Sequence, residues 1–196
     1  QAQLGRDRNV RFVVPTGNFG DALAGYVASR CGLLKHFDVV SAVNANDAMA
    51  RLIAGLPLKK GHTAATLSPA MDIQLPSNFE RLLFEAAGRD GAAVASAYAQ
   101  LANTGEAPLP KAAVAKLGSM GLSAERVSDH ETIDEMKRTH AETGWIVCPH
   151  TAVGLAAARR SPHVDGPVVT LATAHAAKFP ETVKQALGID VGLPDR

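Results

Sequence analysis

Two glycines that enclose two other residues, in Gly17-Asn18-Phe19-Gly20-Asp21, carry the clearest chemical signal in the sequence. The motif follows a β-branched and aromatic run at 11–14 and precedes a helical pattern at 21–30. In such a turn, backbone N–H groups converge at a helix start, where the helix dipole adds partial positive charge. Glycine tolerates a positive φ and leaves the amides uncovered. The pattern predicts an anion site, with Asp21 as a cap of the helix or turn.

Spacing alone leaves a second interpretation open, a tight turn that binds nothing. The motif is neither Gly-x-Gly-x-x-Gly nor a loop ending in Gly-Lys-Ser/Thr, so the two commonest nucleotide fingerprints are missing. Other chemistry is weakly supported. His130-Glu131 begins like a zinc-protease helix, but Asp134 occupies the place of the second histidine, and we predict no metal. Cys148-Pro149-His150 lacks a nucleophile signature.

The elements around the turn indicate an α/β fold. Residues 11–14 and 37–43 read as strands, each followed by a turn and a helix, and two such units in succession predict a parallel sheet. Helical patterns at 78–87, 91–102 and 111–117 precede a strand expected at 125–127, and we interpret 61–144 as a mainly helical insertion. A helix at 132–140, a short strand at 145–147, a helix at 151–160, a strand at 168–171 and a helix from Pro180 to Leu187 complete the prediction.

Composition excludes several classes of protein. The chain has 196 residues, 46% of them hydrophobic and 20% charged, with a net charge of +1, as in ordinary globular proteins. No basic field indicates nucleic-acid binding, and no apolar stretch approaches the roughly 20 residues that a membrane span needs. Two cysteines far apart fit a reducing cytoplasm. Because the chain does not begin with Met, we expect a segment of a longer protein.

Several further motifs, in order along the chain, make it resemble the threonine synthases of the bacterial and fungal subgroup. The glycine turn extends to Val14-Pro15-Thr16-Gly17-Asn18-Phe19-Gly20-Asp21. It is followed by the blocks Asn44-Ala45-Asn46-Asp47, Thr66-Leu67-Ser68-Pro69-Ala70-Met71-Asp72-Ile73, Pro76-Ser77-Asn78-Phe79-Glu80-Arg81, Pro149-His150-Thr151-Ala152-Val153-Gly154 and Leu171-Ala172-Thr173-Ala174-His175-Ala176-Ala177-Lys178-Phe179. One departure is Ala176, where the family usually has proline.

The resemblance implies part of a fold-type-II, tryptophan-synthase-β-like domain that binds pyridoxal 5'-phosphate. Residues 1–60 and 145–196 would belong to the cofactor domain, and 61–144 to the helical insertion. The implied reaction converts O-phospho-L-homoserine and water to L-threonine and phosphate. The cofactor serves as an electron sink, while the protein holds its phosphate and orients its ring.

The resemblance also assigns roles to residues. Gly17, Asn18, Phe19, Gly20 and Asp21 would form the cofactor's phosphate loop, and Thr173 would hydrogen-bond the pyridine nitrogen. Weaker candidates for binding the substrate are Ser68, His150, His175 and Lys178. For these four a structural role remains an alternative, such as a turn start, a helix cap or a solvated charge.

No lysine in this sequence stands in the family's Phe-Lys-Asp context, so the Schiff-base lysine is expected upstream of Gln1, in a missing N-terminal portion of the same enzyme. A Ser-Gly-Asp-Thr-Gly-like loop is also missing. The chain alone is therefore expected to be inactive. Two alternatives remain open: another fold-type-II pyridoxal-phosphate enzyme, such as a threonine dehydratase or cysteine synthase, and a non-catalytic module that binds phosphate or pyridoxal phosphate.

Overall fold

A computed structural model describes residues 8–34 and 36–193 of the chain. Residues 1–7 and 194–196, which the sequence prediction assigned to the cofactor domain, lie outside the described residues. Within the described ranges, the structure contains no helix that combines the length and the apolar character needed to cross a membrane.

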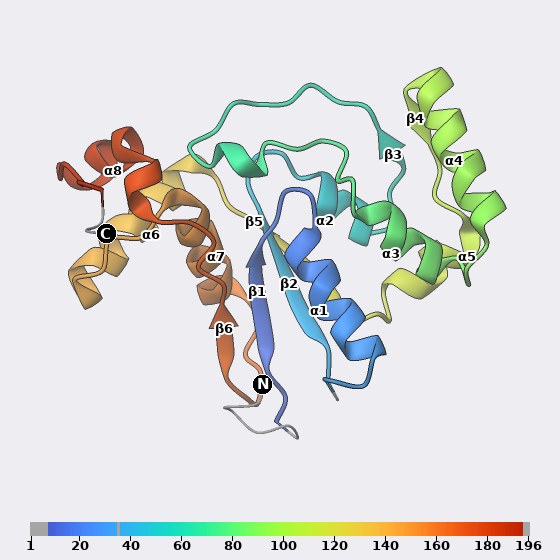
Figure 1. Ribbon diagram of the computed structural model, residues 1–196, viewed down its shortest axis with the longest axis horizontal. Helices are drawn as coiled ribbons and strands as arrows, with labels where there is room; N and C mark the ends of the chain where they lie inside the picture. Colours follow the sequence, from blue (N-terminus) through green and yellow to red (C-terminus); the bar gives the residue numbers. More distant parts are fainter. Residues whose placement is uncertain (1–7, 35, 194–196) are drawn as a thin grey trace.

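The centre of the fold is a parallel sheet of four strands, as the repeated strand-turn-helix pattern predicted (Figure 1). Its spatial order is β5-β2-β1-β6. The strands are β1 (Arg11–Pro15), β2 (Asp38–Val43), β5 (Leu122–Arg126) and β6 (Val168–Thr170). Because all three pairings are parallel, the carboxyl ends of the strands meet at one edge. Ligands of open α/β sheets commonly bind at that edge.

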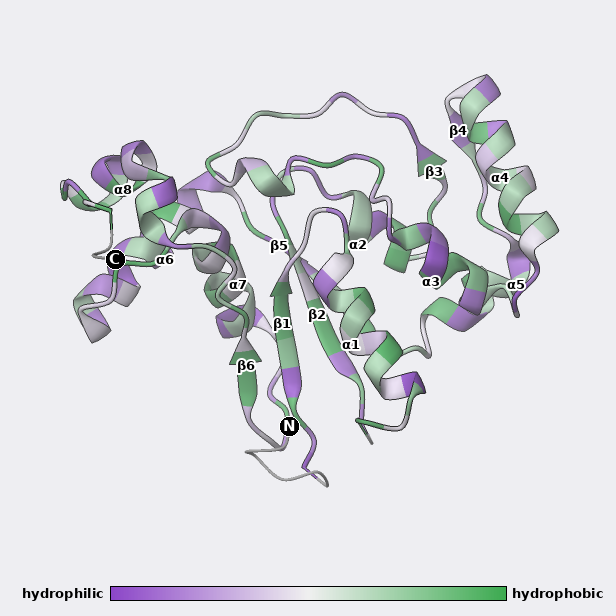
Figure 2. Ribbon diagram, in the orientation of Figure 1, coloured by the Kyte–Doolittle hydropathy of each residue, from purple (hydrophilic) through white to green (hydrophobic). Residues whose placement is uncertain are grey.

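Both faces of the sheet are covered, and β2 shows how. Val39 and Val43 point into one hydrophobic cluster, whereas Val40 and Ala42 point into another, as the two-residue period of a strand requires. Figure 2 accordingly colours most of β2 as hydrophobic. The helix α7 (Pro149–Arg160) packs against β1, β2 and β6 on the second face.

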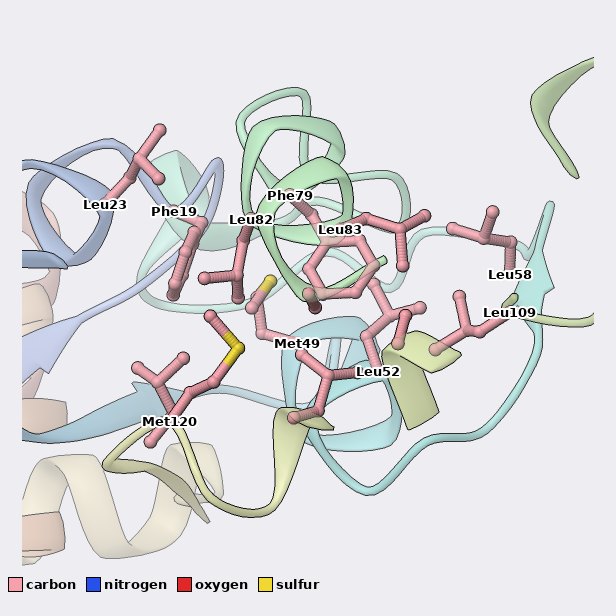
Figure 3. Close-up of a cluster of buried hydrophobic side chains, with 14 of the residues drawn as sticks. Phe19, Leu23, Met49, Leu52, Leu58, Phe79, Leu82, Leu83, Leu109 and Met120 are labelled. Atoms are coloured by element: carbon pink, nitrogen blue, oxygen red, sulfur yellow. The ribbon is translucent and has the colours of Figure 1, made fainter. Parts of the chain in front are cut away.

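The larger cluster lies between the sheet and a group of helices on the first face. These helices are α1 (Gly20–Arg30), α2 (Ala48–Ile53), α3 (Phe79–Ala86), α4 (Gly91–Thr104) and α5 (Lys111–Leu117). In Figure 3, Phe19 from the glycine turn lies beside Leu82 of α3 and near Met49 of α2. The turn is therefore fastened to the core by an aromatic side chain that is 1% exposed.

Two further helices, α6 (Asp129–Thr143) and α8 (Pro180–Leu187), pack together beside α7. The helix expected at 132–140 begins earlier, because Ser128 and Glu131 form a capping box that satisfies its first N–H groups. Gly144 ends α6 in the left-handed conformation.

The strand predicted at 145–147 is wrong. These residues join α6 to α7 without regular structure, and Trp145 is 74% exposed. The apolar run of Trp, Ile and Val is typical of a strand, but Gly144 has just ended one helix and Cys148 already caps the next. The few residues between the two helices are therefore not available to pair as a strand.

The proposed insertion is not purely helical. β5 lies within 61–144, yet it pairs with β2 in the main sheet. The short strands β3 (Leu58–Lys59) and β4 (Glu106–Ala107) form a separate antiparallel pair. Two 3-10 helices, η1 (Pro69–Met71) and η2 (Ala176–Lys178), lie in the segments that follow β3 and β6 along the chain.

Candidate functional site

The glycine turn leaves β1 at the carboxyl edge of the sheet and enters α1. Thr16 secures its start, because its backbone N–H donates to the Ala42 carbonyl at 2.8 Å and its hydroxyl donates to the Val14 carbonyl at 2.6 Å. Asn18 secures its outer side: its carbonyl accepts from the Asn78 N–H at 3.2 Å, and its side-chain oxygen accepts from the Ser77 N–H at 3.3 Å.

The reason that the sequence suggests for the two glycines is wrong in detail. The left-handed residue of the turn is Phe19, with φ of 64°, while Gly17 and Gly20 have no positive φ. Gly17 is required by close approach instead. A Cβ at that position would lie 2.7 Å from the carbonyl oxygen of Ala70 and 3.0 Å from Cα of Met71. Gly20 is far less confined, since only Asn78 Nδ2 comes near, at 3.6 Å.

The backbone amides from Gly17 to Ala22 are available for a ligand. None of these N–H groups donates to another residue within the described part of the chain, and the first helical bond of α1 runs from the Leu23 N–H to the Phe19 carbonyl. Orphan donors at a helix start, together with the helix dipole, attract anions. The expected cap by Asp21 is absent, because α1 has Phe19 as its cap residue and no side-chain cap bond.

A cavity of about 220 Å³ lies against the turn. Besides residues 14–22 it is lined by Ala70, Met71, His150 and Thr173. The volume is several times the roughly 30 Å³ of a water molecule in the liquid. The cavity joins four of the segments that the sequence singled out, and it places two candidate residues, His150 and Thr173, beside the glycine turn.

His150 lies in the first turn of α7 and is 3% exposed. Its Nε2 accepts the Ala70 N–H at 3.0 Å, and its ring packs against Phe179 with the centroids 4.6 Å apart. Burial lowers the pKa of His150, and the charge of Asp72 partly opposes that shift. The role of helix cap considered for His150 belongs to Cys148, whose sulfur accepts from the Thr151 N–H at 3.4 Å.

Thr173 follows β6 and is held through Thr151 of α7. The Thr173 N–H donates to the Thr151 hydroxyl oxygen at 3.4 Å, and the same hydroxyl lies 3.2 Å from Cys148 Sγ. The side chain of Thr173 makes no bond to the other described residues, and the residue is exposed. Its hydroxyl is therefore free to meet a ligand.

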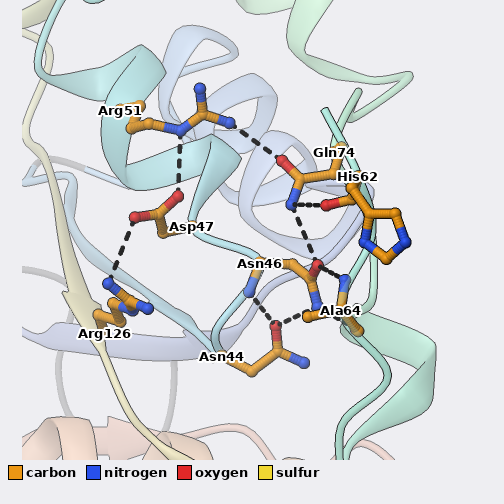
Figure 4. A network of polar contacts seen from close by, with 8 residues as sticks. All are labelled: Asn44, Asn46, Asp47, Arg51, His62, Ala64, Gln74 and Arg126. Carbon is orange, nitrogen blue, oxygen red and sulfur yellow. Dashed lines mark hydrogen bonds and ion pairs between the residues drawn. The ribbon is translucent and has the colours of Figure 1, made fainter. Parts of the chain in front are cut away.

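Ser68 does not line this cavity. It is 1% exposed, and its hydroxyl accepts from Asn44 Nδ2 at 2.9 Å. Asn44, Asn46 and Thr66 all donate to Oδ1 of Asp72, so this partly buried network fixes the segment that carries Ala70 and Met71. Figure 4 shows the part of the network around Asn44 and Asn46, with Gln74 donating to Asn46.

His175 and Lys178 lie farther along the same segment as Thr173, both exposed. His175 Nδ1 accepts the Ala177 N–H at 3.1 Å and so caps η2. Neither residue lines the cavity beside the glycine turn. Ala70, Met71 and Thr151 were not predicted as site residues. The block that contains Ala70 and Met71 was a signal of resemblance, but its contact with Gly17 spans more than 50 residues of sequence.

The fold and this site define an α/β protein with a row of unbonded backbone amides beside a cavity at the carboxyl edge of a parallel sheet. Residues 151–196 match a family model described as threonine synthase, C-terminal. The threonine synthase of Pseudomonas aeruginosa is 40% identical over 195 residues, covering 98% of this chain and 41% of that protein. The threonine synthase of Saccharomyces cerevisiae is 39% identical over 206 residues, covering 95% of this chain and 40% of that protein.

Solved structures agree. The structure described as a PLP-bound threonine synthase from Brucella melitensis has a TM-score of 0.91 and 41% identity, over 98% of this chain and 41% of that one. The yeast threonine synthase has a TM-score of 0.84 and 35% identity, over 94% of this chain and 40% of that one. This chain belongs to the threonine synthase family, and its fold is the fold of those neighbours, as the sequence motifs predicted. It spans about two-fifths of the length of the curated relatives it matches.

Proposed function

We propose that this chain supplies the phosphate-binding part of the pyridoxal-phosphate site of a threonine synthase. The observation that carries the proposal is the row of backbone N–H groups from Gly17 to Ala22, which have no acceptor among the described residues and adjoin a cavity at the carboxyl edge of the sheet. A phosphate offers several acceptor oxygens and negative charge, which suits such a row of donors at a helix start. The PLP bound to the Brucella melitensis relative supports the same choice.

The other end of the cofactor would meet Thr173. A neutral hydroxyl as the partner of the pyridine nitrogen leaves that nitrogen largely unprotonated, and so moderates the electron withdrawal of the ring. When bound, the cofactor would act as the electron sink that stabilises a substrate carbanion. Thr151 would hold the backbone of Thr173 in place, because its hydroxyl accepts the Thr173 N–H.

The reaction we propose for the whole protein converts O-phospho-L-homoserine and water to L-threonine and phosphate, as a PLP-dependent lyase. The substrate brings a second phosphate, for which the exposed His175 and Lys178 remain candidates. Ser68 would contribute indirectly, through the network around Asp72. The Schiff-base lysine would come from a segment upstream of Gln1. This chain alone would therefore bind and orient the cofactor but would not catalyse the reaction.

The same proposal covers the domains of the protein and its cellular compartment. Residues 1–60 and 145–196 would form the cofactor domain, to which β5 adds a strand from within the proposed insertion at 61–144. We place the protein in the cytoplasm, where Cys31 and Cys148 would stay reduced; both thiols are free, and Cys148 uses its sulfur as a helix cap.

The experiment uses the full-length gene product with bound PLP. Addition of O-phospho-L-homoserine should release phosphate and L-threonine in equal amounts. Addition of L-serine or L-threonine should release no 2-oxo acid, which separates this reaction from that of a dehydratase. A protein that binds PLP but releases neither threonine nor a 2-oxo acid would instead be a non-catalytic binding module.

The loop assignment is tested by Gly17→Asp. A side chain there would collide with the Ala70 backbone, and its carboxylate would repel phosphate, so we expect visible absorbance of bound cofactor to be lost. Gly118→Asp is the matched control, since a Cβ at Gly118 meets nothing within 4 Å. Retention of the cofactor by Gly17→Asp at the level of the control would refute the assignment.

A further inference from the structure

His150 connects three segments around the cavity. It belongs to α7, it accepts a hydrogen bond from Ala70 beside η1, and it packs against Phe179 beside η2. The bond to Ala70 joins residues 80 apart in sequence. Because His150, Ala70 and the glycine turn line the same cavity, a change at the imidazole would reach the turn through few contacts.

The bond fixes the chemical form of the imidazole. Nε2 can accept the Ala70 N–H only if it carries a lone pair, so the ring is neutral and its hydrogen is on Nδ1. Nδ1 is buried and has no partner among the described residues. A second proton would place a hydrogen on Nε2, which would face the Ala70 N–H donor to donor.

Ala70 in turn forms the wall against which the glycine turn is packed. Its carbonyl oxygen lies so close to Gly17 that a Cβ there would be only 2.7 Å away. The N–H of the same residue is the group that His150 holds. The far side of the segment is fixed by Asp72, whose carboxylate accepts bonds from Asn44, Asn46 and Thr66.

We propose that His150, as a neutral imidazole, is a positioning residue that clamps Ala70 against Gly17 and so keeps the phosphate loop in its binding geometry. The inference rests on the proposed function and deepens it. His150 then acts through Ala70 and not by touching the substrate, which differs from the direct role that the sequence suggested. Protonation of His150 breaks its hydrogen bond to Ala70. The affinity of the site for the cofactor therefore falls in acid because of a group in the protein.

The surroundings of the imidazole agree with a neutral ring. Burial lowers its pKa, and Asp72 is the charged group that acts in the opposite direction. From the other packed segment the ring meets the uncharged Phe179, while His175 and Lys178 of that segment are exposed. Because the pKa of His150 is lowered from the ordinary histidine value of about 6.5, the imidazole gains a proton only at a more acidic pH than an exposed histidine, and cofactor binding weakens there.

The test measures the dissociation constant of PLP for the full-length gene product between about pH 5 and about pH 8. His150→Leu removes the acceptor, and we expect the dissociation constant to rise about tenfold at the upper pH, since the partly buried Ala70 N–H loses its partner and no longer holds its segment in place. His150→Gln offers a side-chain oxygen within reach of the Ala70 N–H and should stay within about threefold of the wild type there.

The decisive readout is the shape of the pH profile. A phosphate monoester has its own second pKa near 6, which affects all three proteins alike. The wild type should lose additional affinity in acid and His150→Gln should not, so that the Gln variant binds more tightly than the wild type at the lowest pH. If His150 acted only by packing, the dissociation constants of the wild type and of His150→Gln would change with pH in parallel.

Three results would overturn the inference: parallel wild-type and His150→Gln profiles, a His150→Leu variant that binds like the wild type, or a His150→Gln variant that binds no PLP at any pH. If the wild type binds PLP and releases threonine in any of these cases, the proposed function stands and only the clamp falls. If the wild type itself binds no PLP, both fall.

Discussion

Gly17 and Phe19 meet two separate structural demands of the glycine turn. Gly17 lets the backbone of Ala70 approach, whereas Phe19 takes the left-handed conformation and places its ring in the core. Non-glycine residues rarely adopt a positive φ, because the side chain crowds the backbone. The burial of a large aromatic ring in the core offsets that strain and anchors the turn.

The difference between the two glycines leads to a prediction. Gly17→Ala should lower the free energy of unfolding by about 1–3 kcal/mol, because its Cβ has no room beside Ala70. Gly20→Ala, at the start of α1, should change it by less than about 0.5 kcal/mol. Urea denaturation of the full-length protein checks both. Equal losses in the two variants would show that crowding at Ala70 is not what requires Gly17.

Some of this detail could be predicted from the sequence and some could not. Two glycines between a strand and a helix indicate an anion site through local backbone chemistry, which needs no tertiary information. The left-handed residue was misplaced because the conformation of Phe19 is decided by core packing. The closeness of Ala70 to Gly17 was beyond reach for the same reason, since it is a long-range contact.

The first turn of α7 contacts two other segments of the site at the carboxyl edge of the sheet. Cys148 caps the helix, Pro149 occupies the first position, and His150 and Thr151 follow with their side chains in use. Proline suits that position because its missing N–H would have no helical partner. One helix start thus supports both the segment packed against the glycine turn, through Ala70, and the proposed partner of the pyridine nitrogen, Thr173.

Thr151→Val is predicted to loosen the proposed pyridine partner. Valine keeps the shape but removes the hydroxyl that accepts the Thr173 N–H; because that bond is long, at 3.4 Å, we expect a loss of about 1 kcal/mol in cofactor binding. Thr151→Ser keeps the hydroxyl and is the matched control. Titration of each variant with PLP measures the effect. Similar affinities for the Val and Ser variants would contradict the role of the hydroxyl.

Element prediction succeeded where local signals were strong. The helices α1 and α3, and the strands β1 and β2, were anticipated within about two residues from periodicity and turn chemistry. The predicted strand at 145–147 failed because three apolar residues do not specify pairing, and helix ends on both sides claimed the segment. β5 was predicted too late in sequence, at 125–127.

Across the whole molecule, the parallel sheet collects residues that are distant in sequence. The turn after β1 and Thr173 after β6 meet because these strands are neighbours, although more than 150 residues separate them. The alternation of strands and helices indicated a parallel sheet. The order β5-β2-β1-β6 was not predictable from it, because which strands pair depends on packing of both faces.

We propose above all that the free amides of the glycine turn hold the phosphate of pyridoxal phosphate. The most direct measurement is a crystal structure of the full-length gene product with PLP. We expect phosphate oxygens within about 3.2 Å of backbone nitrogens between Gly17 and Ala22, with the pyridine nitrogen facing Thr173. A cofactor bound elsewhere, with these amides facing only water, would contradict the account.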